Sequence, residues 1–464
     1  MLFNTIDFIF FLPVVVIIYY SLSQKGRWIL LLLASYFFYG SWNLNYLAFI
    51  VISTLIDYAC GLKMDKVDSK EKKRPFLILS LVSNLGLLFF FKYYNFFAYN
   101  LNSGISSNFP ILENVILPVG ISFYTFQTLS YSVDVYHGRQ KAESHLGYFA
   151  LYVSFFPQLV AGPIERFSNL TPQFKTEKRL NYENISNGLR LILFGLFVKM
   201  VIADNVSGIV EQVYETPLSY SSWDVLLSSF LYSFQIYSDF FGYSTIAIGS
   251  ARLLGINVMD NFKTPYLSRN IAEFWQRWHI SLSTWFRDYI YYPMGGNRVN
   301  KFKWYLNIFT IFIVSGIWHG ANWTFIFWGA LFGLIYILEK LISKYIPLPK
   351  KNGIVNTVLV LKTFILTTLI WVFFRSQSID EAFQFLARIF EFSSDSKAEL
   401  MIPSYVWFSL IIFIVSEFLL FNSRFDEKLD KIAFPIRWSI YSILLFSILV
   451  FSGVDDFPFI YFQF

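Results

Sequence analysis

Long apolar stretches recur from one end of this chain to the other, and they limit its fold more than any other feature. The clearest lie at 7–22, 28–40, 44–62, 76–97, 226–250, 354–373, 404–421 and 438–453. Several approach the roughly 20 residues that a helix needs to cross a bilayer. Because the hydrocarbon core offers no water to hydrogen-bond, helices are the economical backbone there. The sequence therefore predicts an all-α, polytopic integral membrane protein.

The composition agrees with a bilayer environment and excludes several functions. Charged residues make up only 15% of the chain, against about 25% in soluble domains. The net charge of +6 comes from short loops between apolar stretches, where basic residues set membrane orientation, so we expect no nucleic-acid binding. The single cysteine, Cys60, excludes an internal disulfide and a cysteine-rich cluster. Without metal-ligand spacing or a phosphate-binding loop, we expect no metal and no bound cofactor.

The distribution of Lys and Arg predicts the orientation of the chain. Basic residues cluster at 23–27 and 63–74, whereas the turn at 41–43 and the loop at 98–114 have none. The positive-inside rule then places the N-terminus outside the cytoplasm. The same alternation predicts cytoplasmic faces at 138–146, 251–304 and 422–437. We expect a multi-pass protein of the plasma (inner) membrane, because the N-terminal apolar stretch has no cleavage site typical of a signal peptide.

Two segments do not fit simple crossings. The stretch 147–162 has basic loops on both sides and contains Pro157, which favours a re-entrant or half-crossing segment. The stretch 251–304 mixes aromatic and basic residues without a clean span, which favours interfacial or re-entrant helices. We predict roughly 11–12 transmembrane helices in a single membrane domain over 1–464.

The most notable ionisable residue is His319, at the boundary between two apolar stretches. Placing an ionisable group there costs on the order of 2–3 kcal/mol unless it faces a cavity or a partner. His319 could hydrogen-bond neighbouring helices, or it could take a proton from a hydroxyl group during acyl transfer. Position alone does not decide between these alternatives. Two other histidines, His137 and His145, lie in or beside a hydrophilic loop and are set aside.

Two further polar sites interrupt aromatic stretches. A single helix through EFWQRWHISLST would place Trp275 and His279 on the same side. An interfacial helix anchored by Trp and Arg would explain those residues without catalysis. Asp239 interrupts an otherwise span-like segment that also carries Gln235 and Tyr237. These groups suggest a polar wall, which either lines a substrate path or holds helices together.

Several stretches together resemble one known family. They are LPVGISFYTFQTLSYSVDVYHG (117–138), FFPQLVAGPIERF (155–167), FQIYSDFFGYSTIAIGSARLLG (234–255), the stretch 261–298 ending FRDYIYYPMGGNR, SGIWHGANWTFIFWG (315–329) and the C-terminal FPFIYFQF. In this order they are similar to the membrane-bound O-acyltransferases, and within them to the bacterial branch that includes the membrane protein of alginate O-acetylation. The resemblance implies the fold of that family, a ring of tilted helices around a thinner centre.

The resemblance also implies site residues. His319 matches the histidine of the WHG motif, regarded as the catalytic residue of the family, and His279 matches a second site. We therefore expect His319 to act as a general base and His279 to orient or polarise the thioester. The residues expected to bind substrate are Asp239, Gln235, Tyr237, Trp275, Arg277, Arg287, Asp288, Trp318 and Asn322.

The resemblance implies acetyl transfer across the membrane. The donor would be acetyl-CoA or another acyl thioester on the cytoplasmic side, and the product an O-acetylated exopolysaccharide such as alginate outside. Relatives work with an extracytoplasmic, SGNH-hydrolase-like transferase that accepts the acyl group, so such a partner is expected beside the lipid bilayer. D-alanyl transfer to teichoic acid, peptidoglycan O-acetylation and non-enzymatic transport of an acyl donor or lipid remain alternatives.

Overall fold

Every regular element that the structure describes is a helix, which confirms the predicted all-α class. The computed structural model describes residues 1–105, 107–113, 115–160, 162–345, 353–452 and 459–460. Contacts divide the chain into two compact units. The first is Met1–Ile192 with Ile246–Met259, and the second is Leu193–Thr245 with Asp260–Phe464. The single domain expected over 1–464 stays a prediction.

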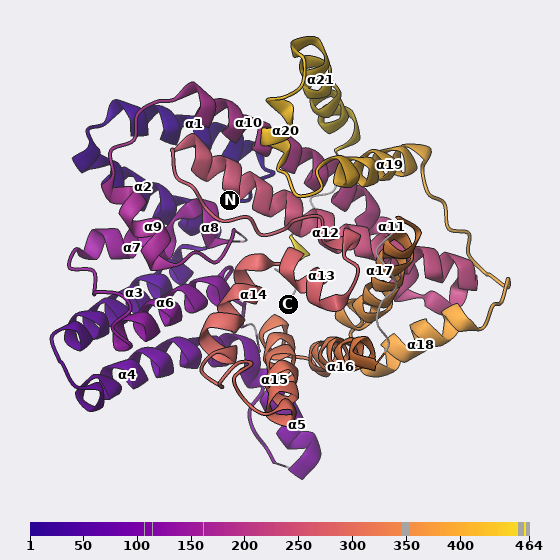
Figure 1. Cartoon of the computed structure of the whole chain (residues 1–464), viewed down its shortest axis with the longest axis horizontal. Helices are drawn as coiled ribbons and strands as arrows, with labels where there is room; N and C mark the ends of the chain where they lie inside the picture. Colours follow the sequence, from indigo (N-terminus) through magenta and orange to yellow (C-terminus); the bar gives the residue numbers. More distant parts are fainter. Residues whose placement is uncertain (106, 114, 161, 346–352, 453–458, 461–464) are drawn as a thin grey trace. The chain divides into compact units, whose positions relative to one another are not determined.

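The first unit contains mostly N-terminal helices (Figure 1). Helix α10 begins in this unit and ends in the second, and the last residues of α12 return to the first. The helices of this unit are α1 (Ile6–Ser21), α2 (Gln24–Gly40), α3 (Leu44–Asp65), α4 (Lys70–Leu88), the π-helix η1 (Phe89–Tyr93), α5 (Tyr94–Ile105), α6 (Ile121–Tyr136), α7 (Leu146–Ser154), α8 (Phe156–Leu159), α9 (Phe167–Lys175) and α10 (Tyr182–Leu196).

Buried polar groups join helices of the first unit. Nδ2 of Asn84 in α4 donates to both carboxylate oxygens of Asp57 in α3, at 2.9 Å each. Ser80 Oγ lies 2.6 Å from the same carboxylate and 2.7 Å from Ser132 Oγ of α6. Such hydrogen bonds between apolar helices hold their register where the hydrophobic effect does not.

The structure also shows where helices begin and end in two stretches of the first unit. Helix α7 has nine residues and is followed by the four-residue α8. At about 1.5 Å per residue, α7 is too short to cross a hydrocarbon core of about 30 Å, in agreement with the prediction that 147–162 is not a full crossing. A loop was expected over 98–114, but α5 continues to Ile105, so the helical run that starts at Lys70 is longer than predicted.

The second unit contains the candidate site. It includes most of α12 (Ser222–Leu253) and the segment Asp260–Phe464, and the predicted site residues from Trp275 onward lie in that segment. Its other helices are η2 (Phe197–Ala203), α11 (Asp204–Glu215), η3 (Pro217–Ser219), η4 (Pro265–Leu267), α13 (Ile271–Arg277), α14 (Ile280–Phe286), η5 (Arg287–Tyr291), α15 (Lys301–His319), α16 (Trp323–Tyr345), α17 (Gly353–Arg375), α18 (Ile379–Phe390), α19 (Ser404–Leu419), α20 (Phe425–Leu429) and α21 (Phe434–Phe451).

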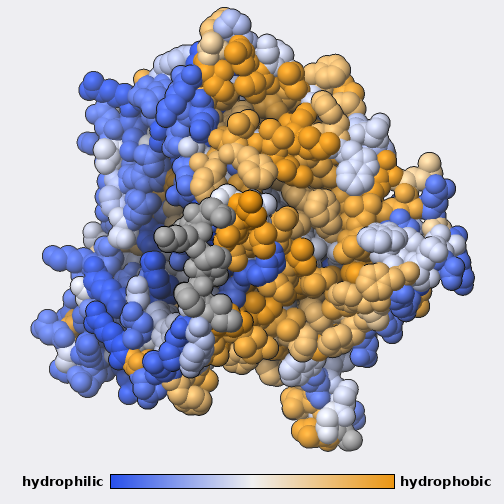
Figure 2. Space-filling model, turned by 45° about the vertical axis from the view of Figure 1, so that its right-hand side comes forward, coloured by the Kyte–Doolittle hydropathy of each residue, from blue (hydrophilic) through white to orange (hydrophobic). Residues whose placement is uncertain are grey.

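Within the described residues, six helical stretches are long and apolar enough to cross a membrane: Leu44–Asp65, Lys70–Ile105, Tyr182–Glu215, Trp323–Tyr345, Gly353–Arg375 and Phe434–Phe451. Two shorter apolar helices are α1 and α19. Figure 2 shows hydrophobic side chains gathered over a large part of the visible surface. Helix α21 exposes such side chains at Ile443, Leu445, Phe446, Leu449 and Val450. Exposed apolar surface of this extent is typical of a chain embedded in lipid, whereas the predicted 11–12 crossings stay a prediction.

Candidate active site

Helices α15 and α16 form a closely packed hairpin that fixes the position of His319. A Cβ atom at Gly316 would lie 2.3 Å from the carbonyl oxygen of Phe325. A Cβ atom at Gly329 would lie 2.3 Å from the carbonyl oxygen of Phe312. The two backbones can therefore approach only because glycine occupies these positions. His319 is the last residue of α15, which confirms its predicted location at the boundary between two helices.

Aromatic rings surround the His319 imidazole, which is 3% exposed. The ring centroid lies 4.9 Å from that of Trp318, 5.0 Å from that of Trp328 and 5.2 Å from that of Phe374 in α17. This enclosure keeps bulk water away from the imidazole. Solvent therefore screens the hydrogen bonds of the imidazole, and the charges that form during proton transfer, less than it would at a surface.

His279 lies at a break between two short helices. Helix α13 ends at Arg277, α14 begins at Ile280, and His279 between them has a left-handed backbone with φ 43° and ψ 54°. The prediction of one helix with Trp275 and His279 on the same side is therefore wrong, because a left-handed residue cannot continue an α-helix. For a residue with a side chain this conformation is strained, and such strain is often found at functional sites.

Asn261 holds the break from the preceding loop. Its Oδ1 lies 3.0 Å from Nδ1 of His279 and accepts hydrogen bonds from Ser281 Oγ at 2.9 Å and Ser281 N at 3.3 Å. Its backbone carbonyl accepts from the N–H of Ile280 at 2.9 Å. These contacts bring one loop residue against three consecutive positions of the break. They explain how the left-handed conformation is maintained without glycine.

His279 is completely buried, and burial lowers its pKa to about 3 because the imidazolium loses its hydration. The imidazole is therefore neutral at physiological pH. Its ring packs against the edge of Phe240 at 4.7 Å. It also lies 6.1 Å from the ring of Trp318, which in turn contacts His319. The two predicted catalytic histidines thus both neighbour the ring of Trp318.

A cavity of about 450 Å³ lies next to the break at His279, because the following residue, Ile280, lines it. Its lining comes from α13, α14, η5, α15 and α16, and includes Trp275, Ile280, Ser283, Arg287, Tyr291, Phe312 and Ser315. Ser315 lies one helical turn before His319 on α15. Trp275 also contacts Trp328, whose ring is 5.8 Å from its own, and Trp328 contacts His319. The rings of Trp275 and Trp328 therefore connect the cavity wall to His319.

Arg287 is the cationic group of the cavity wall, and its side chain is 51% exposed. Its Nε lies 2.9 Å from Oδ1 of Asp288, the other charged residue expected here to bind substrate. An exposed ion pair of this kind contributes little to stability. The guanidinium can therefore exchange part of this contact for an anionic group of a substrate.

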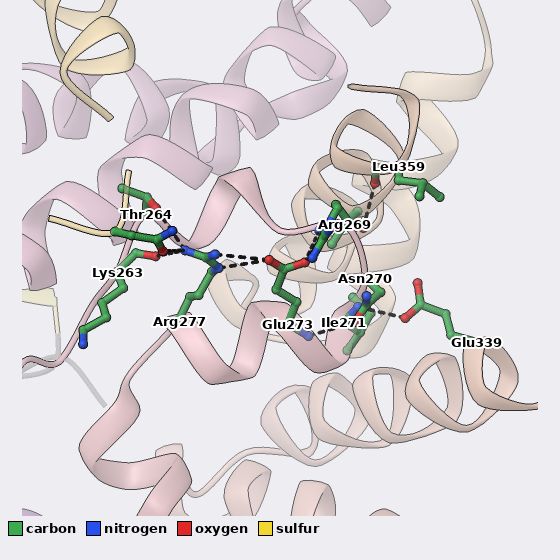
Figure 3. Close-up of polar contacts among 11 residues, drawn as sticks. Lys263, Thr264, Arg269, Asn270, Ile271, Glu273, Arg277, Glu339 and Leu359 are labelled. Carbon is green, nitrogen blue, oxygen red and sulfur yellow. Dashed lines mark hydrogen bonds and ion pairs between the residues drawn. The ribbon is translucent and has the colours of Figure 1, made fainter. Parts of the chain in front are cut away.

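Ion pairs hold helix α13 in place, and they engage Arg277 (Figure 3). Glu273 accepts from Arg269 Nε at 2.9 Å and from Arg277 Nε at 3.2 Å. Arg277 also donates to the carbonyl of Lys263 at 3.1 Å and to Oδ1 of Asn422 at 3.2 Å. These contacts favour a structural role for Arg277 in bracing α13, rather than the substrate binding expected from the sequence.

The other end of α13 is held from α16. Glu339 accepts from the backbone N–H of Ile271 at 2.8 Å and pairs with Lys362 of α17. A carboxylate at a helix N-terminus stabilises the helix through its unpaired N–H groups and its dipole. Because α13 contributes Trp275 to the cavity, Glu339 indirectly fixes one wall of that cavity.

The polar residues of α12 contact protein groups. Asp239 forms a buried ion pair with Lys199 at 2.6 Å and accepts from the backbone N–H of Ile460 at 2.7 Å. Gln235 donates to a serine hydroxyl of α11, and Tyr237 donates to the buried Glu417 at 2.9 Å. These contacts favour the second sequence interpretation, in which this polar wall holds helices together.

Asn322 begins α16. Its Oδ1 accepts from the backbone N–H of Thr324 at 3.0 Å, and its Nδ2 donates to the carbonyl of Gln377 at 2.6 Å. An asparagine that precedes a helix in this way satisfies one of its free N–H groups. The substrate-binding role expected for Asn322 stays a prediction, and the structure shows what it does within the fold.

Residues 29–379 match the sequence model of the MBOAT, membrane-bound O-acyltransferase family. The chain belongs to this family. It is 38% identical over 407 residues to the probable alginate O-acetylase of Pseudomonas syringae pv. tomato, covering 86% of this chain and 77% of that protein. It is 39% identical over 425 residues to the peptidoglycan O-acetyltransferase of Helicobacter pylori, covering 83% and 79%. It is 29% identical over 254 residues to the teichoic acid D-alanyltransferase of Bacillus subtilis, covering 52% and 64%.

Membership of the membrane-bound O-acyltransferase family confirms the resemblance predicted from the sequence. The chain is a multi-pass membrane protein and an O-acyltransferase. All the predicted site residues lie within the matched range 29–379. The roles of individual residues, the acyl donor and the orientation of the termini stay predictions.

Sequence reasoning missed three residues of the O-acyltransferase that contact predicted site residues: Lys199 contacts Asp239, Glu417 contacts Tyr237 and Asn261 contacts His279. Lys199 interrupts the apolar run LFGLFVKMVIAD, and this isolated charge was an available signal for a buried ion pair. Glu417 likewise interrupts an apolar helix. Asn261 carried no such signal, because it lies in a loop rich in polar residues. Only the folded arrangement brings it to His279.

Proposed function

We propose that this O-acyltransferase moves an acetyl group from acetyl-CoA on the cytoplasmic side to a hydroxyl group on the outer side of the membrane. The observation that carries the proposal is the buried pair His279 and His319, which both neighbour the ring of Trp318, with the cavity next to the break at His279. Relatives named as an alginate O-acetylase and a peptidoglycan O-acetyltransferase support acetyl as the transferred group.

His319 acts as the general base in this proposal. Its imidazole takes the proton of the acceptor hydroxyl as that oxygen attacks the acyl carbonyl carbon. A new C–O bond forms, the C–S bond of the thioester breaks, and the departing thiolate receives the proton from the imidazolium. His319 returns to its neutral state, so no other reactant is needed. Burial among aromatic rings supports this role because it limits the access of water to the acyl group.

The cavity accepts the donor arm in this proposal. Apolar residues such as Trp275 and Phe312 suit the chain that carries the thioester, and Arg287 suits an anionic part of the donor near the surface. We place this cavity on the cytoplasmic side, in line with the basic region 251–304, and the N-terminus outside. Holding donor and acceptor in line accelerates the reaction by proximity.

The acceptor in this proposal is an extracytoplasmic polysaccharide such as alginate, reached directly or through an acyl-accepting, SGNH-hydrolase-like partner. The 39% identity to a peptidoglycan O-acetyltransferase favours peptidoglycan as a second candidate acceptor. The teichoic acid D-alanyltransferase covers only 52% of this chain, so D-alanyl transfer is less supported.

The function can be tested with the purified protein in liposomes supplied with acetyl-CoA labelled in its acetyl group. We expect release of free CoA thiol, by slow hydrolysis alone and faster with soluble alginate or peptidoglycan fragments, and label on the added glycan. Transport of intact acetyl-CoA across the liposome without thiol release would contradict an enzyme and favour a transporter. Thiol release that requires a D-alanyl thioester would contradict acetyl as the group transferred.

Filling the cavity should weaken donor binding. Ser315 lines the cavity and is 3% exposed, so a Ser315→Phe side chain would occupy space needed by the donor arm. We expect kcat/KM for acetyl-CoA to fall by roughly 10-fold or more, mainly through a higher KM. Ser315→Ala, which keeps the space, is the matched control and should behave as the wild type. An unchanged KM in a correctly folded Ser315→Phe protein would show that the donor binds elsewhere.

A further inference from the structure

Asn261 is a fully buried residue that no sequence motif assigns to the reaction. Its side-chain oxygen Oδ1 meets Nδ1 of His279 and both the hydroxyl and the backbone N–H of Ser281. A backbone N–H can only donate, so the atom that faces Ser281 N must be the carbonyl oxygen of the amide. The orientation of the Asn261 amide is thereby fixed by its contacts.

This orientation determines which nitrogen of His279 carries the proton. Oδ1 of Asn261 has no hydrogen to give, so the 3.0 Å contact requires that Nδ1 of His279 is the donor. In a neutral imidazole the other nitrogen, Nε2, then carries the lone pair. His279 can accept a hydrogen bond or a proton through Nε2, but it cannot polarise a carbonyl oxygen by donating from that atom.

The amide nitrogen of Asn261 gives a second, independent observation. Its Nδ2 is buried, and among the residues that the structure describes it has no hydrogen-bond partner. A buried donor in that state is destabilising, and such groups are rare unless they serve a function. Packing alone would not favour an asparagine at this position, whereas the contact of its side-chain oxygen with His279 does.

We propose that Asn261 is a positioning residue for acyl transfer, which holds His279 in the Nδ1–H form and leaves Nε2 as a hydrogen-bond acceptor, while His319 remains the base that takes the proton of the acceptor hydroxyl. The proposal rests on the proposed function of His279 and His319. Asn261 does not touch the substrate in this scheme. It acts as the partners of catalytic and metal-bound histidines do, where an oxygen acceptor fixes both the tautomer and the angle of the ring.

Asn261→Leu and Asn261→Asp test the proposal in the full-length protein. Leucine keeps the volume but removes the acceptor, so we expect kcat for acetyl transfer to fall roughly 10-fold to 100-fold, with KM for acetyl-CoA little changed. Aspartate keeps an oxygen facing Nδ1 of His279 and should restore much of that loss near pH 8. Size-exclusion profiles in detergent establish that each variant is folded.

The pH profile separates positioning from packing. A carboxylate at 261 raises the pKa of His279, because an opposite charge stabilises the imidazolium. Below that raised pKa, Nε2 carries a proton and loses its acceptor, so the rate of Asn261→Asp relative to the wild type should fall as the pH falls.

The outcomes distinguish this inference from the function on which it rests. Wild-type kcat in a folded Asn261→Leu protein, or a relative rate of Asn261→Asp that is constant with pH, would overturn the role of Asn261. If His279→Ala were also fully active, the role of His279 itself would fail. If only the Asn261 variants were active, His279 would keep its role and the positioning inference alone would be overturned. An equal loss in both Asn261 variants at every pH would indicate packing and overturn it as well.

Discussion

Replacing His319 by alanine should reduce acetyl transfer to roughly 10⁻² to 10⁻⁴ of the wild-type kcat, the usual contribution of a positioned general base. The loss should appear in kcat rather than in KM, because His319 acts on the proton of the acceptor and not on the bound donor. Thiol release from acetyl-CoA by purified protein in liposomes measures this directly, since it requires no knowledge of the final acceptor.

Alanine at 319 would also leave a void between the rings of Trp328 and Phe374, which destabilises a packed core. His319→Gln fills more of that space and cannot serve as a base, so it separates lost chemistry from lost packing. His137, in a hydrophilic loop of the first unit, offers a matched control, and His137→Ala should keep wild-type kcat. A folded His319→Gln protein with wild-type kcat would refute the base assignment.

The fold class could be predicted from the sequence because one physical constraint dominates it. An apolar stretch of about 20 residues in lipid has few alternatives to a helix, and Trp323–Tyr345 and Gly353–Arg375 illustrate this. Helix ends were less accessible. Helix α5 continues to Ile105 through polar residues that the sequence suggested were a loop, because tertiary contacts and side-chain hydrogen bonds such as that from Asn100 to Phe96 compensate for weak helix propensity.

The position of His319 could be predicted, and the break at His279 could not. His319 stands out as an ionisable group between apolar stretches. The stretch IAEFWQRWHISLSTWF contains neither glycine nor proline, so no local signal interrupts a helix there. The break is held by Asn261, whose backbone carbonyl accepts from the N–H of Ile280. A contact between residues so far apart in the chain is invisible to helical periodicity.

The same limitation applies to charged residues that were expected to bind substrate. Asp239 was singled out because a charge in an apolar stretch requires a partner, whereas Arg277 was expected to bind substrate because of the resemblance. A partner is indeed needed, but the sequence does not identify it. For Asp239 the partners are Lys199 and the N–H of Ile460, and for Arg277 they include Glu273. Whether the partner is a protein group or the substrate depends on the fold.

Replacing His279 should distinguish an orienting acceptor from a proton carrier. His279 has φ 43°, a conformation that asparagine adopts more readily than most residues, so His279→Asn should fold well. The amide of this shorter side chain takes the position of Nδ1 of His279, but it does not reach the position of Nε2. We therefore expect His279→Asn to lower kcat by roughly 100-fold, while a longer glutamine brings its amide oxygen near that place and restores part of the rate.

The comparison of these two variants is informative because each preserves a different nitrogen position of the imidazole. Glutamine at 279 should lower the melting temperature relative to asparagine, since left-handed backbone disfavours it, yet it should be the faster enzyme per folded molecule. Complete loss in both variants would mean that Nε2 must take up and release a proton, which an amide cannot do near neutral pH. Full activity in both would remove His279 from the reaction. A faster glutamine variant would identify the lone pair at Nε2 as the group that the break between α13 and α14 places in the site.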